Sequence, residues 1–87
     1  MKREALRGGK AIELSQREFS LLEYLMRSPG RVFSRSQISQ HVWNTSFDTG
    51  TNMVDVAVAQ LRKKIDEGYD TALIETVRGV GYRMREL

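Results

Sequence analysis

Two helix-start signals constrain this chain more than any other feature of its sequence. Each is a Ser-x-x-Glu or Ser-x-x-Gln capping box, in which two side chains satisfy free backbone N–H groups of the first helical turn, flanked by an apolar pair that fits a hydrophobic staple. The first combines Ser15 and Glu18 with Leu14 and Phe19, and the second combines Ser34 and Gln37 with Phe33 and Ile38. Pro29-Gly30 separates them, because proline disfavours helical geometry in the residue before it. The sequence therefore predicts two short helices, one starting at each serine.

A single apolar stripe predicts a third helix over residues 52–66. Its members recur at i, i+4, i+7 and i+11, which places them on one face of a helix. They are Val54, Val58, Leu61 and Ile65. Thr51 or Asn52 is a suitable N-cap for this helix. Asn44 can end the preceding helix in the left-handed conformation, and Gly68 is the predicted stop of the third helix.

Glycine-containing turns predict a hairpin on each side of the helices. Residues 3–14 form the first around Gly8-Gly9, because a glycine pair supplies the positive φ angles that a tight turn needs. Residues 73–77 and 82–85 form the second around residues 79–81, and residues 31–33 read as a short strand. This order favours an α+β winged helix-turn-helix, with three helices, an N-terminal hairpin and a C-terminal wing. We expect residues 1–87 to form one such domain.

Composition limits the functions open to such a domain. The net charge of +3 permits nucleic-acid binding without requiring it. No apolar run is long enough to span a membrane, and the absence of cysteine suits the cytoplasm. The sole histidine, His41, lies on the second helix, where a lone histidine is more often a surface or packing residue than a catalyst. We therefore expect no enzymatic activity, no metal site and no cofactor.

The face of the third helix opposite its apolar stripe has the chemistry of a DNA-reading surface. That face holds Asn52, Val56, Ala59, Gln60 and Lys63. Asn and Gln side chains can read adenine's edge, a valine can contact the thymine methyl, and an alanine allows close approach. Lys63, with Arg62 at the flank, can hold phosphate or guanine. The same mixture also fits an ordinary helix surface with one exposed valine.

The second hairpin carries an arginine at its tip. A stiff hairpin can insert the guanidinium of Arg78 into the narrow minor groove, where A·T tracts are most attractive. The alternative interpretation is a surface arginine beside turn glycines. Arg78 alone does not distinguish a minor-groove contact from an ordinary surface arginine.

Four motifs in order resemble the OmpR/PhoB-type effector domain of bacterial response regulators. They are residues 14–22, Val42-Trp43, residues 54–58 with 61–64, and residues 76–82. The resemblance covers essentially the whole chain. A weaker similarity, from Phe47-Asp48 through Asn52 and in the Val-Asp-Val-Ala-Val run, points to the heavy-metal, copper-type subgroup.

This resemblance implies roles for individual residues. Helix 52–66 would be the recognition helix in the major groove, and residues 77–82 would be the wing in the minor groove. Thr76 would hold a phosphate, and Trp43 would pack near the DNA backbone. The implied DNA-binding residues are Asn52, Val56, Gln60, Arg62, Lys63, Thr76, Arg78 and Trp43. Contact with RNA polymerase is implied for Asn44, Thr45, Ser46, Phe47, Asp48, Thr49 and Gly50.

The resemblance also implies partners and a larger protein. The full-length regulator would dimerise on direct repeats in promoter DNA and act downstream of a cognate sensor kinase. The family domain opens with a four-stranded antiparallel sheet that follows a receiver domain. We therefore expect this chain to be a fragment lacking the receiver and the first strands, with an unpaired edge on its first hairpin.

One competing function stays open from the sequence. Winged helices also serve as protein–protein docking modules, because a fold does not fix a function. The salt dependence of the binding affinity distinguishes the two functions. DNA binding weakens steeply as salt rises, because counterions are released, whereas apolar docking does not.

Overall fold

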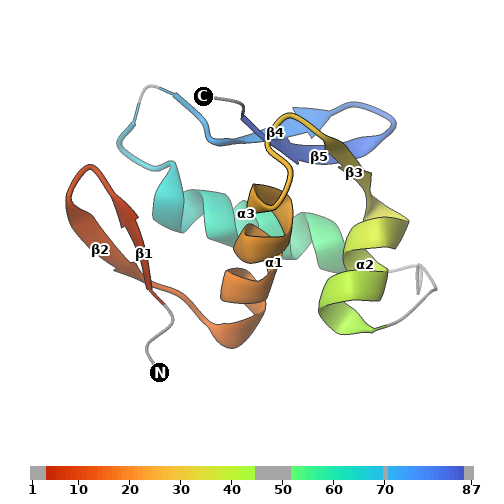
Figure 1. The fold of residues 1–87 in the computed structure, drawn as a ribbon, viewed down its shortest axis with the longest axis horizontal. Helices are drawn as coiled ribbons and strands as arrows, with labels where there is room; N and C mark the ends of the chain where they lie inside the picture. Colours follow the sequence, from red (N-terminus) through yellow and green to blue (C-terminus); the bar gives the residue numbers. More distant parts are fainter. Residues whose placement is uncertain (1–3, 45–51, 70, 86–87) are drawn as a thin grey trace.

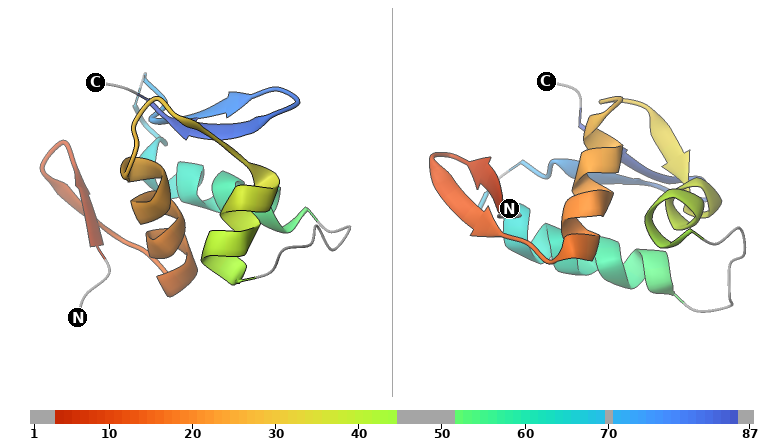
Figure 2. Two further views of the ribbon diagram at one scale, coloured as in Figure 1. Left: turned by 45° about the vertical axis from the view of Figure 1, so that its right-hand side comes forward. Right: turned by 60° about the horizontal axis from the view of Figure 1, so that its bottom comes forward.

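The fold consists of three helices, a three-stranded sheet and a separate hairpin. The computed structural model describes residues 4–44, 52–69 and 71–85. Its elements are β1 (Glu4–Arg7), β2 (Lys10–Glu13), α1 (Gln16–Met26), β3 (Val32–Ser34), α2 (Arg35–Trp43), α3 (Met53–Ile65), β4 (Ile74–Val77) and β5 (Gly81–Met84). In all views the hairpin β1–β2 and helix α2 lie at opposite ends of the molecule, with α1 and α3 between them (Figures 1 and 2). The predicted winged-helix element order is confirmed.

Both predicted capping boxes are present. At the start of α1, the Ser15 hydroxyl accepts from the Glu18 backbone N–H at 3.2 Å, and Glu18 Oε1 accepts from the Ser15 N–H at 2.8 Å. The same reciprocal pair starts α2, where the Ser34 hydroxyl accepts from the Gln37 N–H at 3.1 Å and Gln37 Oε1 accepts from Ser34 at 2.8 Å. Asn44 follows α2 at φ 55°, so its predicted left-handed conformation is also confirmed.

The apolar stripe of α3 faces the core as predicted. Its buried residues are Val54, Ala57, Val58, Leu61 and Ile65. The helix start differs from the prediction in one respect. Asn52 occupies the N-cap position but makes no side-chain capping hydrogen bond, because its φ of −83° and ψ of 38° depart from the extended geometry of a capping residue. Gly68 comes three residues after the helix ends and adopts φ 85°.

Strand β3 joins the C-terminal hairpin in one antiparallel sheet with the order β3-β5-β4. Phe33 pairs with Tyr82 and Ser34 pairs with Gly81. A Cβ atom on Gly81 would lie 2.0 Å from the backbone oxygen of Phe33, so only glycine allows the two strands to approach this closely. The sequence predicts a strand at residues 31–33, one residue before β3 as observed, but nothing local in the sequence specifies its pairing with β5.

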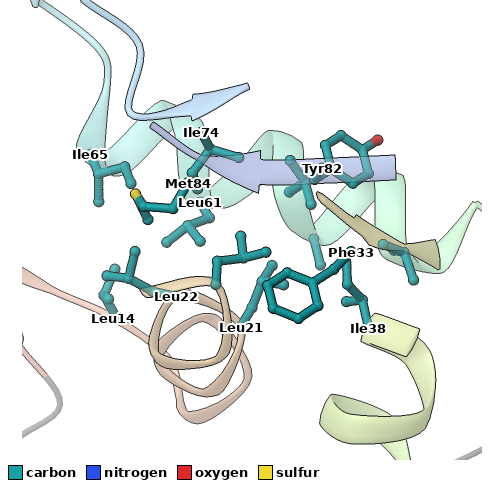
Figure 3. Close-up of a cluster of buried hydrophobic side chains, with 14 residues drawn as sticks. Leu14, Leu21, Leu22, Phe33, Ile38, Leu61, Ile65, Ile74, Tyr82 and Met84 are labelled. Carbon is teal, nitrogen blue, oxygen red and sulfur yellow. The ribbon is translucent and has the colours of Figure 1, made fainter. Parts of the chain in front are cut away.

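The core lies between the helices and this sheet. Its largest fully buried side chains are Leu21, Leu25, Ile38, Leu61, Ile74 and Val58. Figure 3 shows side chains from α1, α3 and β5 pointing toward one another across this space. Burial of a leucine or isoleucine stabilises a fold by roughly 1.5–3 kcal/mol. The core therefore fixes α3 firmly beneath the sheet and leaves its opposite face outward.

The hairpin β1–β2 is a two-stranded sheet of its own, with Ala5 opposite Ile12. Both of these side chains are partly buried against the core. Gly8 and Gly9 adopt φ 58° and 80° at the turn, as the predicted glycine-pair turn requires. An isolated hairpin is marginal in water, so its attachment to the rest of the molecule matters.

Candidate nucleic-acid interface

The outward face of α3 carries the residues that the sequence predicts. Asn52, Val56, Ala59, Gln60 and Lys63 are all exposed. Val56 is 52% exposed, although its neighbours Val54 and Ala57 are buried. Val56 therefore lies outside the core, although other apolar residues of α3 are buried. It is available to contact another molecule.

The wing ends in a tight turn that projects Arg78. The Val80 N–H donates to the Val77 carbonyl at 3.0 Å, and Gly79 between them adopts φ 74°. Arg78 and Val80 are both exposed at this tip. Behind the tip, Glu75 and Arg83 face each other across the strands, with Arg83 Nε 2.9 Å from Glu75 Oε1. This ion pair leaves Arg78 as the exposed cation at the tip.

Two predicted DNA-binding residues, Arg62 of α3 and Thr76 of β4, contact each other. Arg62 Nη2 donates to the Thr76 hydroxyl at 2.6 Å, and Arg62 Nε donates to the Ile74 carbonyl at 3.0 Å. Helix α3 and the C-terminal hairpin are therefore joined directly. Because the Thr76 oxygen accepts from a guanidinium, its own hydrogen remains available for an acceptor such as a phosphate.

Asp55 joins α3 to α2 and β5. Its Oδ1 accepts from Arg35 Nε at 2.9 Å and from the Tyr82 hydroxyl. The hydrogen bond from Tyr82, together with the contact of Arg35, holds the pKa of Asp55 below its ordinary value although burial acts in the opposite direction. Burial raises the pKa of Tyr82, and the bond to Asp55 raises it further. Asp55 therefore stays ionised at neutral pH and fixes the first turn of α3 against its neighbours.

Sequence reasoning missed this Asp55 cluster. Asp55 lies between Val54 and Val56, on neither the core stripe nor the opposite face. The available signal was an acidic residue in the first turn, which is favourable next to the positive end of the helix dipole. Its partners Arg35 and Tyr82 are 20 and 27 residues away in the sequence, so only the fold brings them together.

Trp43 and Asn44, the first residue of the predicted polymerase loop, lie at the end of α2. Trp43 is half-buried against the core, and the guanidinium of Arg17 on α1 lies 5.0 Å from its ring centroid. Asn44 is exposed and ends the helix. The rest of the predicted loop, residues 45–50, lies outside the described residues, as does Thr51.

Neither a metal-binding cluster nor a membrane-spanning helix occurs in the described residues. Within the ranges 4–44, 52–69 and 71–85, no three His, Asp or Glu side chains come together as a metal-binding group would. None of the helices in these ranges is both long enough and apolar enough to cross a bilayer.

Comparisons with known proteins agree with this geometry. Residues 9–84 match the family described as transcriptional regulatory protein, C terminal. The transcriptional regulatory protein PcoR of Escherichia coli is 50% identical over 82 residues, which are 94% of this chain and 36% of PcoR. The chain thus spans about a third of the length of such a relative.

Solved structures of similar proteins share the fold. The DNA-binding domain of CpxR from E. coli superposes with a TM-score of 0.83 at 33% identity, covering 97% of this chain and 83% of that one. The Klebsiella pneumoniae RstA DNA-binding domain, solved in complex with the RstA box, gives 0.83 at 29% identity over 94% and 82%. The chain therefore belongs to the family of OmpR/PhoB-type C-terminal domains of transcriptional regulatory proteins.

Proposed function

We propose that this chain is the effector domain of a two-component response regulator and binds double-stranded DNA sequence-specifically to control transcription. Helix α3 enters the major groove, and the wing, residues 77–82, enters the minor groove. One observation carries the proposal. An exposed face of amide, valine and lysine side chains on α3 and an exposed Arg78 on the wing belong to two elements that Arg62 ties together.

The side chains of α3 and of the wing suit different parts of a DNA site. Asn52 and Gln60 supply amides for base edges, and Val56 supplies a methyl surface for thymine. Lys63 supplies a charge for phosphate, whereas Arg78 suits the negative potential of a narrow minor groove. The RstA DNA-binding domain, which shares this fold, was solved in complex with the RstA box, and this supports DNA binding by this chain.

Arg62, Thr76 and Trp43 are proposed to contact the DNA backbone. Arg62 already donates twice to β4, so its phosphate contact would add to existing bonds. Thr76 has a hydroxyl hydrogen to offer to a phosphate oxygen. Trp43, beside Arg17, presents a half-buried indole at the end of α2.

Further parts of the proposal concern the whole regulator and rest on the family. The loop of residues 44–50 contacts RNA polymerase, and the full-length protein dimerises on direct repeats and responds to a sensor kinase. It acts in the cytoplasm, where bacterial promoters lie. The domain works by binding rather than by catalysis, and its family is one of transcription regulators rather than enzymes.

Selection of bound sequences from a random duplex pool tests the proposal. We expect one enriched site with an A·T preference beside its core, and affinity for that site should fall steeply as salt rises. Equal affinity for single strands of the selected sequence would contradict the proposal. Absence of enrichment, with salt-insensitive binding to a protein instead, would favour the docking module.

A further inference from the structure

Arg7, the last residue of β1, reaches from the hairpin to the C-terminal end of the recognition helix. Its Nη1 donates to the carbonyl of Ile65, the last residue of α3, and lies 2.6 Å from Asp66 Oδ1. Its Nη2 donates to the Thr71 carbonyl at 2.6 Å. One guanidinium therefore bonds to the helix end, the residue that follows it and the loop beyond.

Two further features hold this arginine in place. Its guanidinium lies 3.9 Å from the ring centroid of Tyr69, and the Tyr69 hydroxyl donates back to the Arg7 carbonyl at 3.0 Å. The side chains of Arg7 and Asp66 retain only 14% and 11% of their exposure. Removal of one partner from so enclosed an ion pair leaves the other charge uncompensated, and the surrounding residues must then move to expose that charge to solvent.

The carboxylate that Arg7 holds also fixes the entry of the wing. Asp66 Oδ1 accepts from the Leu73 N–H at 2.9 Å, and Oδ2 lies 3.5 Å from the N–H of Ile74, the first residue of β4. The Leu73 carbonyl in turn accepts from the Arg85 N–H at 2.7 Å. The position of Asp66 therefore sets where both wing strands meet the helix end.

A second attachment lies one helical turn earlier. Arg62 donates to the Ile74 carbonyl and the Thr76 hydroxyl, so α3 holds β4 at both ends of a three-residue stretch. Arg78 comes two residues after Thr76. The separation between the α3 face and the wing tip consequently depends on the bonds of Asp66 and Arg62.

We propose that Arg7 is a positioning residue for DNA recognition: by anchoring Asp66 it sets the wing relative to α3, and so sets where Arg78 meets the minor groove. This inference rests on the proposed function. It assigns the N-terminal hairpin a part in sequence reading although the hairpin carries none of the proposed DNA contacts. Figure 1 shows the hairpin beside the C-terminal end of α3, with β4 and β5 above the helix.

The test compares Arg7→Met, which keeps an apolar stem but removes the charge and the donors, with Lys10→Met on β2. Lys10 is exposed, so its variant removes the same charge from the same hairpin without touching Asp66. Arg7→Lys serves as a rescue variant, because an ammonium can hold Asp66 but not both carbonyls as well. Circular dichroism first verifies that each 87-residue variant is folded.

The first measurement needs no DNA. Amide hydrogen exchange at Leu73 and Ile74 should be about fivefold faster in Arg7→Met, the factor that loss of one typical hydrogen bond predicts. Lys10→Met should match the parent, and Arg7→Lys should fall between. Parental exchange rates at both amides in Arg7→Met would overturn the proposed link. If Arg7→Met is unfolded, Arg7→Gln, which also removes the charge, takes its place with the same expected and contradicting results.

The second measurement uses the selected duplex and two substituted ones, one changed in the core and one with flanking A·T pairs replaced by G·C. Arg7→Met should lose most of the parental flank discrimination and keep the core discrimination within about twofold. A merely structural role would lower the active fraction and scale all three affinities alike. Unchanged ratios in Arg7→Met would therefore refute the inference, whereas a parent that discriminates among no duplexes would refute the proposed function.

Discussion

At the scale of single residues, basic side chains differ in whether the fold already engages them. Arg7, Arg35 and Arg62 are bound to partners within the fold. Lys63 and Arg78 are exposed and lie on the two elements proposed to meet DNA. The net charge of +3 does not show this difference, because it counts cations bonded within the fold together with those on the proposed DNA surface.

Lys63→Met should weaken binding to all duplexes about equally. If Lys63 contacts only phosphate, the slope of log affinity against log salt should become shallower by about 0.9, the value for one released counterion. Fluorescence anisotropy over a salt series measures this slope. Lys10→Met is the control and should keep the parental slope, and an unchanged slope in Lys63→Met would remove Lys63 from the interface.

Glu18 gives a prediction about pH. Burial alone would raise its pKa, but the hydrogen bonds from Lys64 Nζ at 2.6 Å and from Ser15 lower the pKa below the ordinary value of 4.5. Because the pKa is lower in the folded state, ionised Glu18 stabilises the fold above the unfolded value. That contribution is lost as pH falls through the folded value.

Glu18→Gln should therefore reduce the free energy of unfolding by about 1–2 kcal/mol at neutral pH and by much less once the parental carboxyl is protonated. Urea denaturation at neutral pH and at an acidic pH below the folded pKa of Glu18 measures the two differences. Glu23→Gln is a matched control, since the Glu23 pair with Arg27 is exposed and should contribute little. An equal loss at both pH values for Glu18→Gln would contradict the assignment.

At the scale of elements, starts and ends of helices were predictable because their signals are local. The boxes at Ser15 and Ser34 and the left-handed Asn44 each depend on neighbours within a few residues. Strand pairing was less predictable. The β3-β5 pair depends on Gly81, whose need for a missing Cβ appears only when Phe33 lies opposite it.

Gly81→Ala should separate β3 from β5 and cost about 2–4 kcal/mol of the free energy of unfolding, the range of a severe steric conflict. Gly68→Ala is the comparison, because its Cβ would meet no atom within 4 Å and only its φ of +85° opposes the substitution. That substitution should cost about 1–2 kcal/mol. Urea denaturation measures the free energy of unfolding of both variants. Equal losses in the two would show that the close approach of β3 and β5 is not critical.

At the scale of the whole molecule, the two ends of α3 are held by different groups. Asp55 binds Arg35 and Tyr82 at the N-terminal end, and Asp66 binds Arg7 at the C-terminal end. The sequence predicted the exposed face between them because that face follows from helical periodicity. It could not predict either cluster, because the partners come from elements far away in the chain.

Arg62 thus joins the helix face and the wing hairpin, the two parts of the proposed DNA-reading surface. In the proposed function, helix α3 and the wing read separate parts of a single DNA site. Separate reading requires that a change in one element alters preference in its own part of the site and leaves the other part unaffected.

The most direct test measures the affinities of the parent, Gln60→Ala and Arg78→Ala for a panel of duplexes derived from the selected site. Gln60→Ala should lose roughly 1–3 kcal/mol of discrimination at one or two core base pairs and keep the flanking A·T preference. Arg78→Ala should weaken binding and lose the flanking preference while the core preference persists. If both variants discriminated among the duplexes as the parent does, α3 and the wing would not be the DNA-reading surface.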